Sequence, residues 1–294
     1  MTPNTRPSLR PRHRALLTTA AVSLAFLTGC TQPAALETGN ETDPPGPISH
    51  IHSISVDPDS GHLILAAHEG LFEVTPEQVD KIGPTIDLMG FAPAENGTYY
   101  ASGHPGPGTD LPDPVGLIRS TDRGETWQPV SLEGESDFHA LTITGNGLLG
   151  YDGTLKSTTD YNEWTTIDAG IQPRALAGTA GSPVVLATTE QGIQRSEDNG
   201  QTWTKPGDSP VLLLVAFADD TTAAGVAPDG TAYISDDAGK SWQPTGGTVT
   251  GAPAALAAET EANGAVTFWV ATSTAVEYSE DGGATFTSRS LGLN

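Results

Sequence analysis

One phrase of eight residues occurs four times in this chain and constrains its fold more than any other feature. The phrase is Ser-x-Asp-x-Gly-x-Thr/Ser-Trp/Phe, and its copies begin at Ser120, Ser196, Ser235 and Ser279. A degraded fifth copy begins at Ser157, so that successive starts are separated by 37, 39, 39 and 44 residues. A repeat of about 40 residues in a chain of short strands is typical of solenoids and propellers.

Each residue type in the phrase has a structural use at a turn between two strands. An Asp in a turn accepts hydrogen bonds from the backbone N–H groups that follow it, and a Gly two residues later adopts a positive φ without a Cβ clash. The closing aromatic residue is well placed to fill the gap between neighbouring sheets. A calcium loop is the alternative, but the phrase lacks the run of ligands and the distal bidentate Glu of such a loop. Four of the five tryptophans occupy the closing position: Trp127, Trp164, Trp203 and Trp242.

The segments between the repeated turns predict an all-β, six-bladed β-propeller over residues 48–294. Short strands, most of them introduced by Gly, precede the turns, as in Gly116-Leu-Ile-Arg and Gly192-Ile-Gln-Arg. Each follows a further strand, such as Val184-Val-Leu-Ala-Thr, and that strand follows a third, such as His139-Ala-Leu-Thr-Ile. With the strand after the turn, each unit has four strands in meander order, which is a propeller blade. A seventh unit is not found, and the pattern leaves open how the ring closes.

The N-terminal segment indicates a targeting signal and a tether. Four arginines precede an apolar run, Ala15 to Leu27, that is too short to span a membrane. The run ends in Leu27-Thr28-Gly29-Cys30, which resembles a bacterial lipobox. This resemblance implies that residues 1–29 are a lipoprotein signal peptide and that Cys30 carries the lipids, which would anchor the chain to the cell membrane on its extracytoplasmic face. Residues 30–47 are rich in Pro, Thr, Gly and acidic groups, as in a flexible linker. An ordinary secretory signal with an incidental Cys is the alternative.

The chain is strongly acidic. Its net charge is −23, and without the four arginines of residues 1–29, nine Lys and Arg face 36 Asp and Glu, which gives −27. Such a chain does not bind nucleic-acid phosphates or anionic lipid headgroups by charge, so nucleic acid is excluded as a partner. Cys30 is the only cysteine, which excludes an intrachain disulfide and leaves no thiol for catalysis. The length suits one globular domain, and we expect a monomer.

The first strand of each propeller blade lines the central channel, so aligning these strands predicts which side chains meet there. The alignment brings unlike polar residues to equivalent positions, and we expect them at or near one mouth of the channel. One ring contains His52, Met89, His139 and Arg174; the ring two residues earlier contains His50, Asp87, Asp137 and Gln172; the loop after the second strand contributes His68, His104, Asp152 and Glu190.

The histidines are distributed unevenly along the chain. Outside the signal segment there are six, none follows His139, and all except His62 occupy the aligned positions of the first three blades. Neutral imidazoles together with a thioether suit copper or zinc. The aspartates could be further ligands or could orient the imidazoles, and Gln172 and Arg174 are candidates for contacting a small ligand. The candidate metal ligands are His50, His52, His68, Met89, His104 and His139.

Two other interpretations of the channel mouth stay open. The same residues could form a polar pocket for a sugar or a peptide. They could also hold only water and backbone groups, as polar residues in propeller channels often do. No His-Glu-x-x-His or Cys-x-x-Cys spacing is present to favour a metal by motif.

The eight-residue phrase resembles the Asp-box, or BNR repeat, of sialidases, sortilin-like receptors and many bacterial propellers. Further segments resemble a group of actinobacterial propeller lipoproteins that are commonly labelled glycosyl hydrolase or exo-sialidase. These segments include His50-Ile-His-Ser-Ile-Ser-Val-Asp-Pro, Ala66-Ala-His-Glu-Gly-Leu-Phe and Asp137-Phe-His-Ala-Leu. The resemblance implies the same lipid-anchored, six-bladed form, and it does not establish the labelled activity.

A sialidase resembling the known families would need three arginines that clamp the substrate carboxylate, a Tyr–Glu nucleophile pair and an Asp acid/base. Only five arginines follow the signal segment, and of these only Arg174 aligns with the channel. The Arg-Ile-Pro motif of that family is missing, so sialidase activity is not expected. A different glycosidase could draw a carboxylate pair from four candidate catalytic residues: Asp87, Asp137, Asp152 and Glu190.

The sequence therefore leaves three functions open. The first is a surface lipoprotein that binds a metal ion or small ligand at the channel mouth, without hydrolysis. The second is a glycosidase that acts on cell-envelope or environmental glycans, so whether the chain is an enzyme is undecided. The third is a protein-interaction platform like the sortilin-type propellers.

Overall fold

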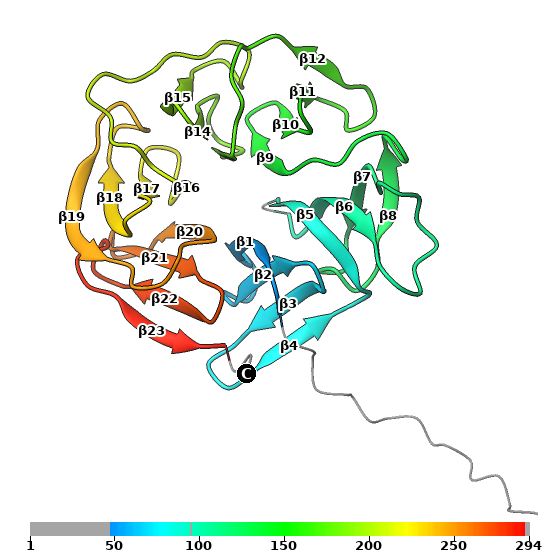
Figure 1. Cartoon of the computed structure of the whole chain (residues 1–294), viewed down its shortest axis with the longest axis horizontal. Coiled ribbons are helices and arrows are strands. Elements are labelled where there is room, and N and C mark those ends of the chain that lie inside the picture. Colours follow the sequence, from blue (N-terminus) through cyan, green and yellow to red (C-terminus); the bar gives the residue numbers. More distant parts are fainter. Residues whose placement is uncertain (1–47, 95, 292–294) are drawn as a thin grey trace, which may run out of the picture. The chain divides into compact units, whose positions relative to one another are not determined.

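Six antiparallel β-sheets stand around a central axis like the blades of a propeller (Figure 1). The computed structural model describes residues 48–94 and 96–291, which form 23 strands and no helix. The predicted all-β, six-bladed β-propeller is therefore confirmed. None of the described residues belongs to a helix that could cross a membrane. The predicted signal peptide, Cys30 and linker lie outside the described residues.

The strands of each blade follow chain order from the channel to the rim (Figure 1). Blade 1 contains β1 (Ile51–Val56), β2 (Leu63–Ala67), β3 (Gly70–Val74) and β4 (Val79–Ile82). Blade 2 contains β5 (Ile86–Pro93), β6 (Tyr99–Pro105), β7 (Leu117–Ser120) and β8 (Gln128–Ser131). Blade 3 contains β9 (Ala140–Thr144), β10 (Gly147–Tyr151), β11 (Leu155–Thr158) and β12 (Thr165–Ile167).

The second half of the ring repeats this arrangement with one strand fewer. Blade 4 contains β13 (Ala175–Gly178), β14 (Val185–Thr189) and β15 (Gly192–Ser196). Blade 5 contains β16 (Leu214–Phe217), β17 (Ala223–Val226), β18 (Thr231–Ser235) and β19 (Gln243–Thr248). Blade 6 contains β20 (Ala255–Thr260), β21 (Val266–Ala271), β22 (Ala275–Ser279) and β23 (Thr287–Ser290).

Each full copy of the repeated phrase forms a turn closed by its own side chains. In the first copy, Asp122 Oδ1 accepts from the N–H of Thr126 at 2.9 Å, and Asp122 Oδ2 accepts from its hydroxyl at 2.5 Å. Ser120 Oγ accepts from the N–H of Gly124 at 2.8 Å, and Gly124 has a φ of +94°. The Ser120 hydroxyl also donates to Asp122 Oδ1 at 2.7 Å. The same four contacts recur in the copies that begin at Ser196, Ser235 and Ser279. Both carboxylate oxygens of each turn aspartate thus accept hydrogen bonds within the turn, as the structural interpretation predicts.

The hydrophobic core consists of six clusters, each shared by two neighbouring blades. The closing aromatic residue of each repeated phrase packs into the cluster that its blade shares with the preceding blade. Trp127 of blade 2 packs against the cluster with blade 1, and Trp242 of blade 5, which is 8% exposed, packs against the cluster with blade 4. The predicted use of these side chains to fill the gaps between sheets is confirmed. The other members are Trp164, Trp203 and Phe286.

Blade 4 departs from the prediction of four strands in every blade. Its fourth strand is reduced to one bridge, in which Thr204 and Arg195 exchange backbone hydrogen bonds of 2.8 and 2.9 Å. Pro206 has no N–H to donate and Gly207 has low strand propensity, so the ladder stops there. Lys205 covers the edge instead, because its Nζ donates to the carbonyl of Gln191 at 2.9 Å.

The ring closes by packing, without exchange of a strand between its ends. Among the described residues, blade 1 is built wholly from the N-terminal strands and blade 6 wholly from the C-terminal ones. Ile51 and Ile54 of β1 share a buried cluster with Ala255 and Ala257 of β20. At the rim, the Arg289 side chain of β23 donates to the backbone carbonyl of Thr75.

Candidate functional site

The six inner strands enclose a cavity of about 900 Å³ along the propeller axis. The innermost strand of each blade is hydrogen-bonded to a neighbouring strand on one side only. Its unpaired edge and the residues at its ends therefore face this cavity. Five candidate residues line the cavity: His50, His52, Met89, His139 and Arg174.

His139 and Arg174 hold the same backbone position in neighbouring blades. Each directly precedes its inner strand, and its N–H donates to a carbonyl near the end of the second strand, at 3.0 Å for His139 and 2.8 Å for Arg174. Leu213 and Ala254 make the same hydrogen bond in blades 5 and 6, at 2.8 and 2.9 Å. The backbone frame that aligned these residues in the sequence therefore holds in the structure, and they share one mouth of the cavity.

Two of the inner strands carry a β-bulge at the cavity. Ile51 pairs with Ala67 and Ser53 with Ala66, which leaves His52 as the extra residue of β1. In β5 the register shifts in the same way between Leu88 and Gly90, so Met89 is the extra residue of that strand. A bulge redirects a side chain away from the regular alternation of the strand, so both candidate ligands owe their positions to an irregularity.

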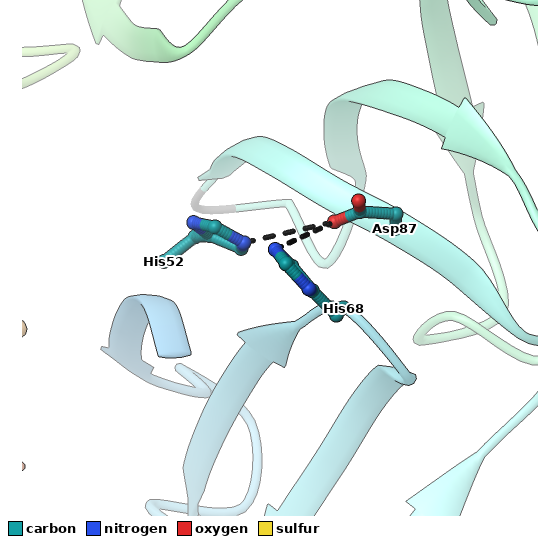
Figure 2. A group of neighbouring side chains, drawn as sticks. All are labelled: His52, His68 and Asp87. Atoms are coloured by element: carbon teal, nitrogen blue, oxygen red, sulfur yellow. Dashed lines mark ion pairs between the residues drawn. The ribbon is translucent and has the colours of Figure 1, made fainter. Parts of the chain in front are cut away.

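His52 of β1, His68 of the β2–β3 turn and Asp87 of β5 converge into one group, called here the Asp87 cluster (Figure 2). Nε2 of His52 lies 3.6 Å from Asp87 Oδ1, and Nε2 of His68 lies 3.8 Å from the same oxygen. One ligand atom from each residue lies within 4.8 Å of the other two. His52 Nε2 and Asp87 Oδ1 are buried and have no hydrogen-bond partner among the described residues.

The imidazoles of this cluster are packed against one another. The ring of His68 stacks on the ring of His52 with 4.7 Å between centroids, and it meets the ring of His50 edge-on at 4.8 Å. Burial lowers the pKa of His52, and the neighbouring His68 lowers it further, against the opposing attraction of Asp87. A lowered pKa keeps the imidazole neutral near pH 7, which leaves a nitrogen lone pair free to bind a metal ion.

A second group, called here the Asp137 cluster, lies in blades 2 and 3. Asp137 Oδ2 is 3.1 Å from Nε2 of His104 and 3.0 Å from Nε2 of His139. The other ring nitrogen of His104, Nδ1, lies 2.6 Å from Asp113 Oδ1. The contact with Asp113 raises the pKa of His104, against the opposing effect of burial, and the charge of Asp137 raises it further. These distances are those of hydrogen bonds, so Asp137 Oδ2 is engaged within this cluster, whereas the buried Asp137 Oδ1 has no hydrogen-bond partner among the described residues.

Asp113 is a site residue that the sequence analysis missed. It lies in the β6–β7 loop, residues 106–116, which is longer than the equivalent loop of every other described blade. Long ordered loops at the mouth of a rigid scaffold often carry function. The signal in the sequence is the segment rich in Pro and Gly from Pro105 to Gly116. Its length distinguishes blade 2 from the other blades.

Three other candidates lie outside both clusters and outside the cavity lining. Asp152 is engaged by Lys156, whose Nζ lies 2.5 Å from Asp152 Oδ2. Although burial raises the pKa of Asp152, the hydrogen bonds from Lys156 and from neighbouring hydroxyl groups outweigh it and lower the pKa. Gln172 and Glu190 are exposed to solvent. His62, the histidine that the sequence set apart, contacts Glu73 at 3.0 Å.

Comparison with known families identifies the repeated turn. A profile of the BNR/Asp-box repeat matches residues 118–129 and 233–244, so the chain carries Asp-box repeats. No curated protein matches the chain in sequence. Among solved structures, the propeller is similar to YCF48 bound to a D1 peptide, with a TM-score of 0.54 and 19% identity over 82% of this chain and 81% of that one.

Two further structures come from different classes of protein. The GH74 enzyme of Niastella koreensis has a TM-score of 0.55 and 17% identity, and the match covers 82% of this chain but 37% of that enzyme. The WD40 β-propeller domain of Doa1 has a TM-score of 0.56 and 12% identity over 84% of each chain. The chain thus spans little more than a third of the GH74 enzyme, and at these identities the similarity shows the propeller fold alone.

Proposed function

We propose that this Asp-box propeller binds a transition-metal ion, zinc or copper, at the Asp87 cluster. The observation that carries the proposal is a pair of buried ligand atoms that face each other without a hydrogen bond. His52 Nε2 and Asp87 Oδ1 lie 3.6 Å apart, and neither has a hydrogen-bond partner among the described residues.

The spacing within the cluster suits a shared cation better than direct contact. Direct N–H···O hydrogen bonds have distances of about 2.7 to 3.2 Å, and leaving a buried polar group unpaired costs roughly 1–3 kcal/mol. Two ligands held at about 2.1 Å in tetrahedral geometry are separated by roughly 3.4 Å. The separations from Asp87 Oδ1, 3.6 Å to His52 and 3.8 Å to His68, are close to that value.

The ligand types support zinc or copper over the harder cations. Two imidazole nitrogens and one carboxylate suit zinc or copper, whereas magnesium and calcium take oxygen ligands. Three protein ligands leave a fourth position open, as in zinc sites that bind an exogenous group. His52 also lines the axial cavity, and so does Met89, whose thioether would favour copper.

We extend the proposal to the cellular location, on the strength of the lipobox-like segment before Cys30. The metal site would then be held outside the cytoplasm by a lipid anchor, with the acidic surface facing solvent. Metabolic labelling with a palmitate analogue tests the anchor: wild-type chain should incorporate label and partition into membranes, and a Cys30→Ser variant should not. Equal labelling of both would overturn it.

Metal stoichiometry tests the proposed function. Protein stripped with a chelator should bind close to one equivalent of zinc or copper after dialysis, measured by elemental analysis. A His52→Ala/His68→Ala variant should bind none. His62→Ala is the matched control, because His62 pairs with Glu73 away from the cavity, and it should bind as the wild type does. Failure of the wild-type protein to retain either metal would overturn the proposal.

A glycosidase is the second candidate, favoured by two carboxylates, Asp87 and Asp137, that each face a pair of imidazoles. A GH74 enzyme also shares the fold. Turnover of chromogenic glycosides or of β-glucan oligosaccharides that an Asp137→Asn variant abolishes would support it. Absence of turnover across sialosides and neutral glycosides would leave the metal site or a protein-interaction role.

A further inference from the structure

Arg174 stands apart from the other described arginines because its side chain has no partner. Arg119 hydrogen bonds to Tyr100, Arg123 pairs with Asp57, and the Arg195 and Arg289 side chains bond to Glu197 and to a backbone carbonyl. Among the described residues, the Arg174 guanidinium makes neither an ion pair nor a hydrogen bond, and the residue is exposed. In a chain with 36 acidic residues and 13 basic ones, an unpaired arginine at the entrance to a cavity is available to a ligand.

The position of Arg174 places it at the same mouth as the imidazoles. Its backbone N–H makes the hydrogen bond that His139 makes in the neighbouring blade, and both residues line the cavity with His52. Blades 5 and 6 carry Leu213 and Ala254 at this position. The mouth therefore has a polar arc over blades 1 to 4 and an apolar arc over blades 5 and 6.

The charges along the cavity indicate what sort of ligand fits. Among the lining residues, Arg174 and Glu259 alone belong to the Lys, Arg, Asp and Glu types. Glu259 lies near the end of β20 (Ala255–Thr260), whereas Arg174 precedes the start of β13, so they face opposite ends of the cavity. A guanidinium binds a carboxylate with two parallel hydrogen bonds, and a metal ion with an open position binds a second oxygen donor.

We infer that the cavity mouth binds a small dicarboxylic acid, with one carboxylate on Arg174 and the other on the metal ion of the Asp87 cluster. This inference rests on the proposed metal site, which supplies the second positive charge. The apolar arc of blades 5 and 6 would lie beside the methylene groups that join the two carboxylates. A monocarboxylate would satisfy only one of the two positive groups, so affinity should depend on having both acid groups and on the distance between them.

Calorimetry of the zinc-loaded protein with succinate, glutarate and adipate tests this inference, with butyrate as the monocarboxylate control. We expect one of the diacids to bind more tightly than butyrate. Arg174→Gln should weaken the affinity for that diacid by about 10- to 100-fold, the loss expected for a charge-assisted pair. Arg174→Lys should recover part of the affinity. Arg119→Gln, which alters an arginine on the third strand of blade 2, should bind as the wild type does.

Zinc binding, measured first on the same proteins, separates the two proposals. Arg174→Gln should still bind one zinc, because the residue is not a ligand. Zinc retained with no diacid preference over butyrate, or with a preference that Arg174→Gln leaves unchanged, overturns the inference and leaves the metal site intact. Failure of the wild-type protein to bind either zinc or copper overturns both.

Discussion

Asp57 should hold blades 1 and 2 together more strongly than any exposed ion pair of this chain. Its carboxylate is 1% exposed and accepts from the hydroxyl of Tyr99, from Ser60 at 2.8 Å through both N–H and hydroxyl, and from Arg123 Nε at 3.1 Å. Burial alone would raise the pKa of Asp57, but the hydrogen bond from Tyr99 and those from Ser60, with the charge of Arg123, lower it to about 2.

The magnitude follows from the difference between this pKa and the ordinary value. The pKa falls from 3.8 to about 2, and each unit is worth about 1.4 kcal/mol, so the ionised carboxylate stabilises the fold by roughly 2 kcal/mol. Because the folded pKa is the lower one, this contribution is complete above about pH 4 and disappears as the pH falls toward 2. Asp57→Asn should therefore lower the free energy of unfolding by roughly 2 kcal/mol at pH 7.

Urea unfolding followed by tryptophan fluorescence at pH 7, 4, 3 and 2 measures this prediction. The difference between wild type and Asp57→Asn should be constant from pH 7 to 4 and should shrink steadily below pH 4. Asp59→Asn changes an exposed carboxylate of the same turn and should have little effect at any pH. A difference that persists undiminished at pH 2, or an equal loss in both variants, would refute the reasoning.

Three further predictions concern packing, titration and metal binding. Gly90→Ala should lower the free energy of unfolding by roughly 1–3 kcal/mol, because the added Cβ would lie 2.3 Å from the backbone carbonyl oxygen of Phe138. Gly207→Ala is the control: its Cβ would have no atom within 4 Å, so it should be neutral in the same urea titration. Asp113→Asn should lower the pKa of His104 in an NMR titration, because Asp113 raises that pKa. The stability that the His104–Asp113 contact contributes should be full at acidic pH and should be lost as the pH rises through the pKa of His104 in the folded protein. Zinc at a hundredfold excess over its dissociation constant should add about 2.7 kcal/mol and raise Tm by roughly 5–10 °C, and a variant lacking both histidines of the Asp87 cluster should show no shift.

The fold could be predicted from the sequence because its determinants are local. Each Asp-box turn is closed by residues within eight positions of one another, so the spacing of Ser120, Asp122 and Gly124 already contains the geometry. The closing tryptophans repeat with the blades, and their packing between sheets follows from that period. The fourth strand of blade 4 could not be predicted from the period, since Lys205 and Pro206 follow an intact Asp-box and end the ladder after a single bridge.

The site could be predicted only in outline because its contacts join residues of different blades that lie far apart in the sequence. The sequence frame brought His52, Asp87 and His139 to one mouth, since equivalent positions in different blades meet around the axis. It did not separate the candidates into two clusters, because that separation follows from contacts between side chains of different blades. It also gave no reason to expect Asp113 beside His104, since the loop that carries it has no counterpart in the other blades.

The repeat itself explains why differences between blades are the place to look for function. His139, Arg174, Leu213 and Ala254 hold one backbone position and donate the same hydrogen bond. The scaffold therefore needs only the peptide group at this position and accepts an imidazole, a guanidinium or an apolar side chain equally. A histidine or arginine there is not required by folding, because blades 5 and 6 carry Leu213 and Ala254 at the position that His139 and Arg174 hold in blades 3 and 4. The side chains at this mouth are thus free of the constraint that fixes the Asp-box turns, so polar residues could be introduced in some blades without disturbing the others.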